Sequence, residues 1–596
     1  MAFLDRTTKL RVRRTLRRKQ RQVEAVTSRA EERFDKQFID RLERLLDVQR
    51  FVIGWLFLVV AISVLTVLQT VGLNQYHLKF GPVAGGIYTE GMVGSYTNAN
   101  PIYATGPVDT SVSRLLFSGL FKYDDLNHLV GDLAQSYQVD ESGRQYTVNL
   151  KQNLRWHDGT PLTSRDVVFT YNLIQNPDAR SPLFSSWQGI SVSAPNLSTV
   201  IFQLPGALTA FPYSLTTGII PMHKLAKVPA SQLRTDSFNT TAPVGAGPFQ
   251  WDTLQLGSSI QSGEAVTLIS MKAFDEYVGG KPKLEGFVLH VFDSEEQLVA
   301  AYKKRSVEAM AGLKFLPKSL QQSEEIYTYE FSTTAATMVF FKTSEGILSD
   351  AVLRQALIQG ADQNEIIKRL GGVLKPVKSP FLAGQIGYDK AYEQAAFNPA
   401  SAATQLEQAG WIRGKDGKRS KNGQSLQFQI VAEETPDNQI VLKELQESWK
   451  GLGITMIPVL QTTTDFQSAV ETHSYTALLY GISIGADPDV YAYWSSTQAD
   501  VRSSNRLNFS EYKSALADTA LEGGRTRQDP LVRALKYKPF LKAWQEDAPA
   551  LGLYQPRSLY ITRGPIAGLE IHQINTDADR YYSVGNWTVK TGHIPK

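Results

Sequence analysis

Residues 477–494 read ALLYGISIGADPDVYAYW, and this stretch decides how the chain is interpreted. The apolar run 475–480 leads into Gly481-Ile482-Ser483-Ile484-Gly485, a match to the G-x-S-x-G pattern of the nucleophile elbow in serine hydrolases. The alternative is a strand that ends at a ligand-binding cleft. In the first case Ser483 is a nucleophile, and in the second it is a cleft-lining or hinge residue.

The residues after Ser483 separate the two interpretations. An elbow requires a helix directly after the serine, because its amides help to form the oxyanion hole. Pro488 lacks the N–H that such a helix needs, and its ring clashes with the preceding turn. The sequence therefore favours the strand. Asp547 and His572 follow Ser483 in the chain order of a hydrolase triad, so a hydrolase remains an alternative.

Outward from this stretch, the sequence predicts alternating helices and strands. Residues 146–150 read as a strand, and a helix follows Thr163, with Asp166 completing a capping box. Ser294 and Asn398 are predicted to cap two further helices, the second with proline at its first position. This pattern indicates a mixed α/β protein.

Five motifs carry a resemblance to a known family. They are LRWHDGTPLTSRDVVFTY (154–171), PVGAGPF (243–249), YVGGKPKLEGFVLHVF (277–292), LSDAVLRQALIQGADQNEII (348–367) and FNPASAATQLEQAGW (397–411). Together, and in this order, they resemble the family 5 extracellular solute-binding proteins, which include dipeptide, oligopeptide and nickel receptors of ABC importers. The resemblance covers about residues 83–590.

The resemblance implies a two-lobed α/β fold, the type II periplasmic-binding-protein fold of the three-subdomain peptide-binder type. The first lobe is expected at 83–334, with an inserted subdomain at about 115–205. The second lobe is expected at 335–482, and residues 483–596 are expected to return to the first. Crossings between the lobes are expected near 331–336 and 480–487, with ligand enclosed between the lobes.

The segment around Pro488 departs from the family pattern. Peptide receptors of the family carry Trp-x-x-Asp-x-x-x-Pro here, and the Asp pairs with the peptide's α-ammonium. Aligned on Pro488, the Trp position is Gly481 and the Asp position is Ile484. Either Asp487 or Asp489 substitutes, or the ligand has no amine. An equally open reading makes Asp487 the N-cap of a helix that starts at Pro488.

The expected ligand-contacting residues are Tyr480, Ser483, Asp487, Asp489, Glu90 and Asn98. No catalytic residue, metal or cofactor is expected. His157 lacks a second ligand at metal-binding spacing and is assigned to a structural turn. Gly245 and Gly247 are expected to shape a turn that passes close to other backbone.

The N-terminal region predicts a membrane anchor. Residues 1–50 hold 15 Lys and Arg against 8 Asp and Glu, and residues 51–68 carry no charge. These 18 residues span roughly 27 Å as a helix, so 51–71 is predicted to cross the membrane with the basic segment in the cytoplasm. A 50-residue basic region is too long for a signal peptide. The chain has no cysteine, which excludes a lipoprotein anchor.

The basic segment itself has two parts. Residues 6–21 contain nine Lys and Arg, a pattern that serves as a topology signal or holds anionic lipid or nucleic acid. Residues 29–48 repeat apolar side chains at helical spacing, so a cytoplasmic amphipathic helix is expected.

The sequence therefore predicts a membrane-anchored, non-enzymatic substrate-binding protein of an ABC importer. It is expected to capture an oligopeptide or similar small polar solute outside the cell and to deliver it to permease and ATPase subunits. We expect a monomer with no nucleic-acid partner. The alternatives are a receptor that signals through its cytoplasmic tail, a binder of a sugar or metal chelate, and a serine hydrolase.

Overall fold

The computed structural model describes residues 10–19, 21, 23, 49–257, 267–313, 315–321, 326–371, 374–503, 506–570 and 573–595. The chain divides into two compact units, one of residues 1–81 with 591–596 and one of residues 82–590. Each unit is described by itself.

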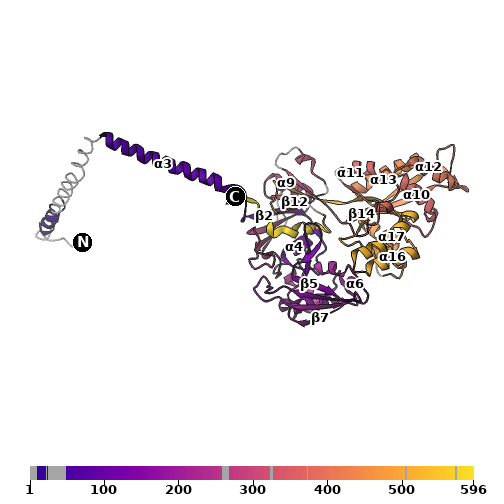
Figure 1. Ribbon diagram of the computed structural model, residues 1–596, viewed down its shortest axis with the longest axis horizontal. Helices are drawn as coiled ribbons and strands as arrows, with labels where there is room; N and C mark the ends of the chain where they lie inside the picture. The colour runs from indigo at the N-terminus through magenta and orange to yellow at the C-terminus, as the bar shows by residue number, and fades with distance from the viewer. Residues whose placement is uncertain are drawn as a thin grey trace, which may run out of the picture. The chain divides into compact units, whose positions relative to one another are not determined.

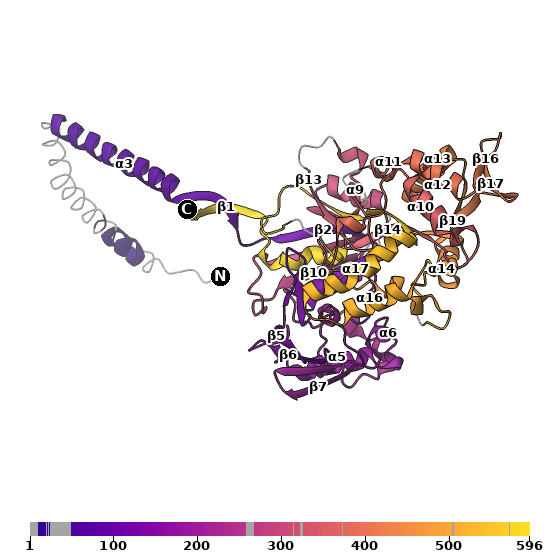
Figure 2. The ribbon, with the colours of Figure 1, turned by 45° about the vertical axis from the view of Figure 1, so that its right-hand side comes forward.

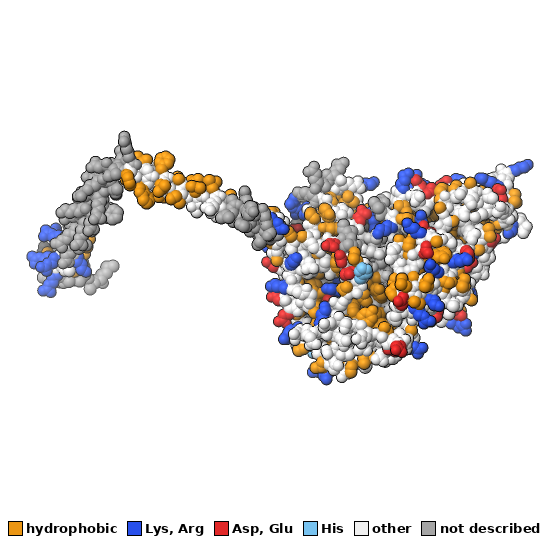
Figure 3. Space-filling model, in the orientation of Figure 1, with side chains coloured by type: hydrophobic (Ala, Val, Ile, Leu, Met, Phe, Trp, Pro, Cys, Tyr) orange, Lys and Arg blue, Asp and Glu red, His pale blue; other side chains and the backbone are white. Residues whose placement is uncertain are grey.

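The first unit contains the long helix α3 (Gln49–His77). Among the described residues, its segment Phe51–Val71 is the one helix long and apolar enough to cross a membrane. The apolar side chains of this segment are exposed, and Figure 3 shows them along the visible face of the helix. Residues 10–19 are also helical, whereas the amphipathic helix expected at 29–48 lies outside the described residues. Strand β1 (Leu78–Val83) follows α3 directly and pairs with the C-terminal strand β24 (Lys590–Pro595), beside which Figure 2 places the C-terminus.

The second unit has two lobes, each built on its own sheet (Figure 1). The first lobe holds a seven-stranded sheet in the order β13 (Tyr327–Ser332), β23 (Arg557–Thr562), β12 (Ala309–Leu313), β2 (Ile87–Val93), β11 (Gly286–Phe292), β10 (Thr267–Ala273), β9 (Phe249–Leu256). The central strand β2 is parallel to both neighbours. Helices α4 (Pro107–Leu116) and α9 (Glu295–Lys303) contribute to the two apolar cores of this lobe.

A subdomain with its own four-stranded sheet is inserted in the chain between β2 and β9 of the first lobe. Its sheet has the order β5 (Ala134–Val139), β6 (Gln145–Leu150), β8 (Thr199–Gln203), β7 (Ser191–Asn196). Helix α5 (Ser164–Ile174) packs on this sheet and has the predicted capping box of Thr163 and Asp166. The predicted N-caps Ser294 and Asn398 are likewise confirmed by their bonds to helix amides.

The second lobe holds a six-stranded sheet with helices on both faces. Its order is β15 (Lys375–Pro376), β22 (Ala550–Gln555), β14 (Ala335–Phe341), β21 (Ala477–Ser483), β19 (Gln427–Glu433), β20 (Thr455–Gln461). One face packs on α10 (Ala351–Gln359), α11 (Gln363–Leu370), α12 (Pro399–Gln408) and α13 (Pro436–Gly451). The other packs on α14 (Thr463–Thr472), α15 (Tyr491–Trp494), α16 (Ala515–Arg525) and α17 (Pro530–Asp547). Alternate side chains of β14 supply the two cores, as a sheet buried on both faces requires.

Two crossings join the lobes. The first runs from β13 to β14 through Thr333 and Thr334, where the sequence predicted it. The second runs from β22 to β23 through Pro556, and Thr333 N–H donates to the carbonyl of Pro556 at 3.1 Å, so the crossings are bonded to each other.

The second crossing corrects the expected one near 480–487 and the expected boundary at 482. Residues 483–555, with α16 and α17, belong to the second lobe, because Trp494, Tyr537 and Trp544 complete its core. The pairing of β22 with β14 joins residues more than 200 positions apart, which local sequence patterns do not indicate.

Candidate functional site

Strand β21 presents a free edge at its C-terminal half. Ile484 N–H donates to the carbonyl of Thr334 at 2.8 Å, so the even-numbered residues of this strand bond to β14. Because peptide groups alternate sides along an antiparallel strand, Leu479, Gly481 and Ser483 direct theirs to the opposite edge. On that edge β19 pairs only with Ala477 and Leu478. The two strands then separate and leave an opening.

A cavity of about 360 Å³ lies beside this free edge. Its described lining consists of Phe315, Thr337, Leu370, Gly371, Leu374, Glu433, Thr435, Asp437, Asn438, Phe466, Leu479, Tyr480, Gly481, Tyr554, Pro556 and Arg557. Most of these residues come from the second lobe, while Phe315 follows β12 of the first lobe and Pro556 lies in the second crossing. The cavity therefore lies where the lobes meet, within the size range of small-molecule sites.

Tyr480 and Gly481 shape the wall formed by β21. The Tyr480 ring packs against Phe466 and Phe509, with ring centroids 5.7 and 5.1 Å away, and burial raises the pKa of its hydroxyl. A Cβ atom added at Gly481 would meet no atom within 4 Å. A ligand can thus approach the peptide group of Gly481 closely, because no side chain stands in front of it.

The polar part of the cavity comes from the end of β19 and the first turn of α13. The Oε1 of Glu433 accepts a hydrogen bond from Thr463 Oγ1 at 2.7 Å, and Thr435 caps α13 by accepting from Asn438 N–H. Asp437 lies in the first helical turn. Arg557 donates to Glu330 at 3.0 Å and to the carbonyl of Gly371 at 3.2 Å.

Ser483 ends β21 and is not followed by a helix. Residues 484–490 are irregular, and the next helix, α15, begins at Tyr491. The Ser483 side chain is exposed, and its carbonyl accepts a hydrogen bond from the Tyr493 hydroxyl at 2.8 Å. The strand–turn–helix of a nucleophile elbow is therefore absent at residues 481–494. His572 lies outside the described residues.

Asp487 and Asp489 are both paired with arginine. Arg533 donates to both carboxylate oxygens of Asp487, and Arg525 donates to Asp489 Oδ2 at 3.1 Å. Burial raises the pKa of Asp489, against the opposing charge of Arg525. The helix expected to begin at Pro488 is corrected to start at Tyr491 with Val490 at its N-cap position, so Asp487 does not cap it.

Glu90 and Asn98 lie apart from the cavity. Glu90 is 0% exposed on the central strand β2, and its oxygens accept hydrogen bonds from Arg580 at 2.5 Å, Tyr581 at 2.6 Å and Tyr560 at 2.7 Å. Asn98 is buried, and its Oδ1 accepts the N–H of Asn100 at 2.8 Å. In this structure both side chains hold the first lobe together. Of the six expected contact residues, only Tyr480 lines the cavity.

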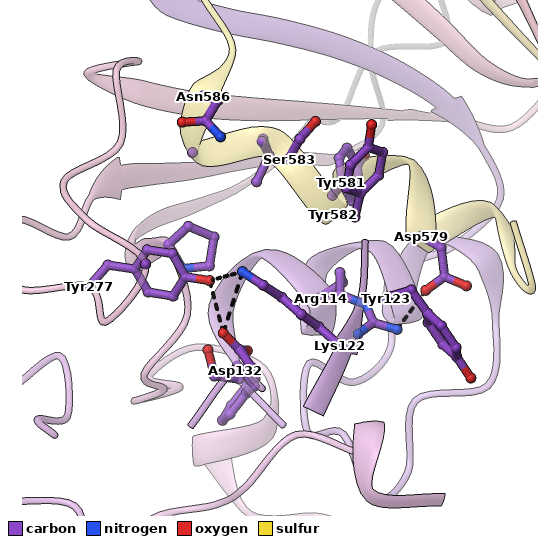
Figure 4. A pocket seen from close by; sticks show the side chains of 16 residues that line it. Arg114, Lys122, Tyr123, Asp132, Tyr277, Asp579, Tyr581, Tyr582, Ser583 and Asn586 are labelled. Carbon is purple, nitrogen blue, oxygen red and sulfur yellow. Dashed lines mark hydrogen bonds and ion pairs between the residues drawn. The ribbon is translucent and has the colours of Figure 1, made fainter. Parts of the chain in front are cut away.

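A second cavity, shown in Figure 4, lies inside the first lobe. Lys122 Nζ points to the hydroxyl of Tyr277 at 3.1 Å and to Asp132 at 3.5 Å, while Arg114 pairs with Asp579 at 2.7 Å. The volume is about 60 Å³, room for a few water molecules. Its two ion pairs balance in charge within the lobe.

His157 occupies the structural turn that the sequence assigned to it. Its Nδ1 accepts the N–H of Gly245 at 3.1 Å, and its Nε2 lies 3.1 Å from the carbonyl of Gly247, to which it donates. Burial lowers the pKa of His157 to about 4. A Cβ at Gly245 would lie 1.9 Å from the carbonyl oxygen of Leu116, which confirms that this turn passes close to other backbone.

The sequence did not lead us to expect Glu433 and Asp437 in the cavity. It also did not predict the arginine partners of Asp487 and Asp489. The segment EETPD at 433–437 gave a signal, since acids stand where a strand ends and a helix begins. Nothing in the local sequence pairs Asp487 with a residue 46 positions away.

Residues 128–503 match the family model of the bacterial extracellular solute-binding proteins, family 5. The oligopeptide-binding protein AppA of Bacillus subtilis is 25% identical over 505 residues, which cover 82% of this chain and 90% of AppA. The probable D,D-dipeptide-binding periplasmic protein DdpA of Escherichia coli is 23% identical over 436 residues, covering 71% and 79%.

Solved structures show the same fold. AppA from B. subtilis in complex with a nonapeptide superposes with a TM-score of 0.66 at 23% identity, covering 86% of this chain and all of AppA. NikZ from Campylobacter jejuni in complex with Ni(L-His) gives 0.67 at 23% identity, covering 84% and 99%. The two-lobed type II periplasmic-binding-protein fold is therefore confirmed. Since the family model spans more than half of its length, the chain belongs to the bacterial extracellular solute-binding proteins of family 5.

Proposed function

We propose that this protein is the membrane-tethered substrate-binding subunit of an ABC importer and that it binds an oligopeptide in the cavity beside β21. The observation that carries the proposal is the free edge of β21, where Leu479 and Gly481 direct peptide groups toward the opening between β21 and β19.

An extended peptide is the ligand that this edge suits best. A peptide can add to an exposed strand edge through main-chain hydrogen bonds, while pockets receive its side chains. The absence of a side chain at Gly481 permits the close approach that such pairing needs. Phe315, Phe466 and Tyr554 supply apolar surface for side chains in the same cavity. The relative AppA, named an oligopeptide-binding protein, supports the assignment.

Helix α3 supplies the tether in this proposal. Its apolar segment Phe51–Val71 is long enough to cross a bilayer core, and the basic residues 1–50 favour a cytoplasmic N-terminus. The binding unit, residues 82–590, is then held outside the membrane as a monomer and passes its ligand to separate permease and ATPase subunits.

Native mass spectrometry and calorimetry of the full chain in detergent test the proposal. We expect the purified protein to retain peptides and to bind a random pentapeptide mixture. Gly481→Val should weaken binding at least tenfold, because the branched side chain obstructs the strand edge. Gly564→Val is the matched control, since a Cβ there also meets no atom within 4 Å but lies outside the cavity. A retained sugar or metal chelate, with no peptide binding, would contradict the assignment.

A further inference from the structure

We infer that Glu433 and Asp437 recognise a positively charged group of the ligand, an ammonium or guanidinium. The inference rests on the proposed function, since it concerns the same cavity, and it assigns two specificity-determining residues that replace the acid missing at Ile484.

The charge balance of the cavity is the first argument. Of the described residues that line it, Glu433, Asp437 and Arg557 are charged. Arg557 already donates hydrogen bonds to Glu330 at 3.0 Å and to the carbonyl of Gly371 at 3.2 Å. Glu433 accepts one neutral hydrogen bond, from Thr463, and neither it nor Asp437 forms an ion pair with a described residue. Among the described lining residues, these two carboxylates are therefore negative charges without an ion-pair partner.

Asp487 and Asp489, in the loop that follows β21, are the alternative partners for a ligand cation. Their existing ion pairs disfavour that role. Both oxygens of Asp487 are held by Arg533, and the two side chains are 5% and 3% exposed. Asp489 bonds to Arg525 and accepts the N–H of Tyr491. A ligand ammonium would have to displace the buried Arg533 at Asp487 or the partly buried Arg525 at Asp489, which costs more than pairing with a free carboxylate.

The rest of the lining suits an organic cation. Phe315, Phe466, Tyr480 and Tyr554 line the same cavity as the two carboxylates. Aromatic faces attract ammonium and guanidinium groups, and the attraction grows when water is excluded. A partly buried carboxylate also gains most from a counter-charge that the ligand brings with it. Carboxylates and aromatic rings at one opening together favour a cationic ligand group over an anionic one.

The test uses the full chain in detergent and four random pentapeptide libraries. The libraries carry a free or an acetylated N-terminus, and each is made with and without Lys and Arg. Native mass spectrometry identifies the bound peptides, and calorimetry measures their affinity. Binding of free-amine peptides without Lys or Arg assigns the α-ammonium as the recognised group. Enrichment of Lys or Arg in the acetylated library assigns a side chain.

Glu433→Gln and Asp437→Asn keep size and hydrogen bonding and remove one charge each. We expect the double variant to bind the cationic peptides at least tenfold more weakly and the acetylated, uncharged peptides unchanged. Glu434→Gln is the matched control, because this exposed neighbour does not line the cavity. Melting temperatures of all variants verify that the fold is intact.

Failure of this inference and failure of the proposed function give different results. If the wild type and the double variant bind cationic peptides equally, the inference is wrong while the peptide assignment stands. If acetylated, uncharged peptides bind the wild type best, the inference is also wrong. If no library binds the wild type, the proposed function itself is contradicted and the inference with it.

Discussion

Arg533 forms a bidentate ion pair with Asp487, in which Nη1 donates to Oδ2 at 2.6 Å and Nη2 donates to Oδ1 at 2.7 Å. The Nε of Arg533 also donates to the carbonyl of Gly524, at the end of α16. One buried arginine on α17 therefore fixes both the loop that follows β21 and the neighbouring helix.

We expect Asp487→Asn to destabilise the protein strongly, because it leaves the guanidinium of Arg533 buried without its counter-charge. Breaking a buried pair from one side costs roughly 3–5 kcal/mol. Urea unfolding of the wild type and the variant measures the difference. Asp500→Asn, which removes an exposed partner of Arg502, should leave stability nearly unchanged. Equal unfolding midpoints for wild type and Asp487→Asn would show that the pair does not hold the loop.

Gly245→Ala should also destabilise the fold. The added Cβ would lie 1.9 Å from the carbonyl oxygen of Leu116, and this backbone must shift to admit it. Overpacking of this kind costs about 1–3 kcal/mol, or more where backbone moves. Gly206→Ala is the matched control in the same lobe, because a Cβ there meets nothing within 4 Å. Thermal unfolding distinguishes them, and equal melting temperatures would refute the close approach.

Ser483→Ala should leave stability and peptide affinity nearly unchanged, within about 0.5 kcal/mol. The side chain is exposed at the end of β21 and does not line the cavity, and the Ser483 carbonyl that accepts the Tyr493 hydroxyl is kept in the variant. Labelling with a fluorophosphonate should fail for both proteins. A hydrolytic activity that disappears in the variant would overturn the assignment of this chain as a binding protein.

His157 should make stability fall on acidification. Burial lowers its pKa to about 4 in the folded protein, so the unfolded chain takes up the proton first as the pH drops below the ordinary value near 6.5. The stability due to neutral His157 is complete above pH 6.5 and is lost progressively down to about pH 4, with a slope of at most about 1.4 kcal/mol per pH unit.

The comparison for this effect is His157→Gln, whose side chain does not titrate. Unfolding free energies of both proteins between pH 4 and 7 isolate the histidine, since all other groups are shared. The advantage of the wild type should shrink as the pH falls. A difference independent of pH would mean that His157 stays equally protonated in the folded and unfolded states.

The sequence by itself determined the local elements and the family. Helix caps at Thr163, Ser294 and Asn398 were predictable because each depends on residues within one turn. Pro488 disfavoured a helix directly after Ser483, because proline acts on its own backbone and the preceding turn. The apolar span in α3 was equally a property of consecutive residues.

Only the tertiary structure decided the lobe boundary and the site. The second crossing depends on the pairing of β22 with β14, and the burial of Glu90 depends on Arg580, 490 positions away. The cavity exists because β19 and β21 separate after Val431 and Leu478. Such contacts join residues distant in the chain, and a sequence pattern records only what neighbouring residues impose on one another.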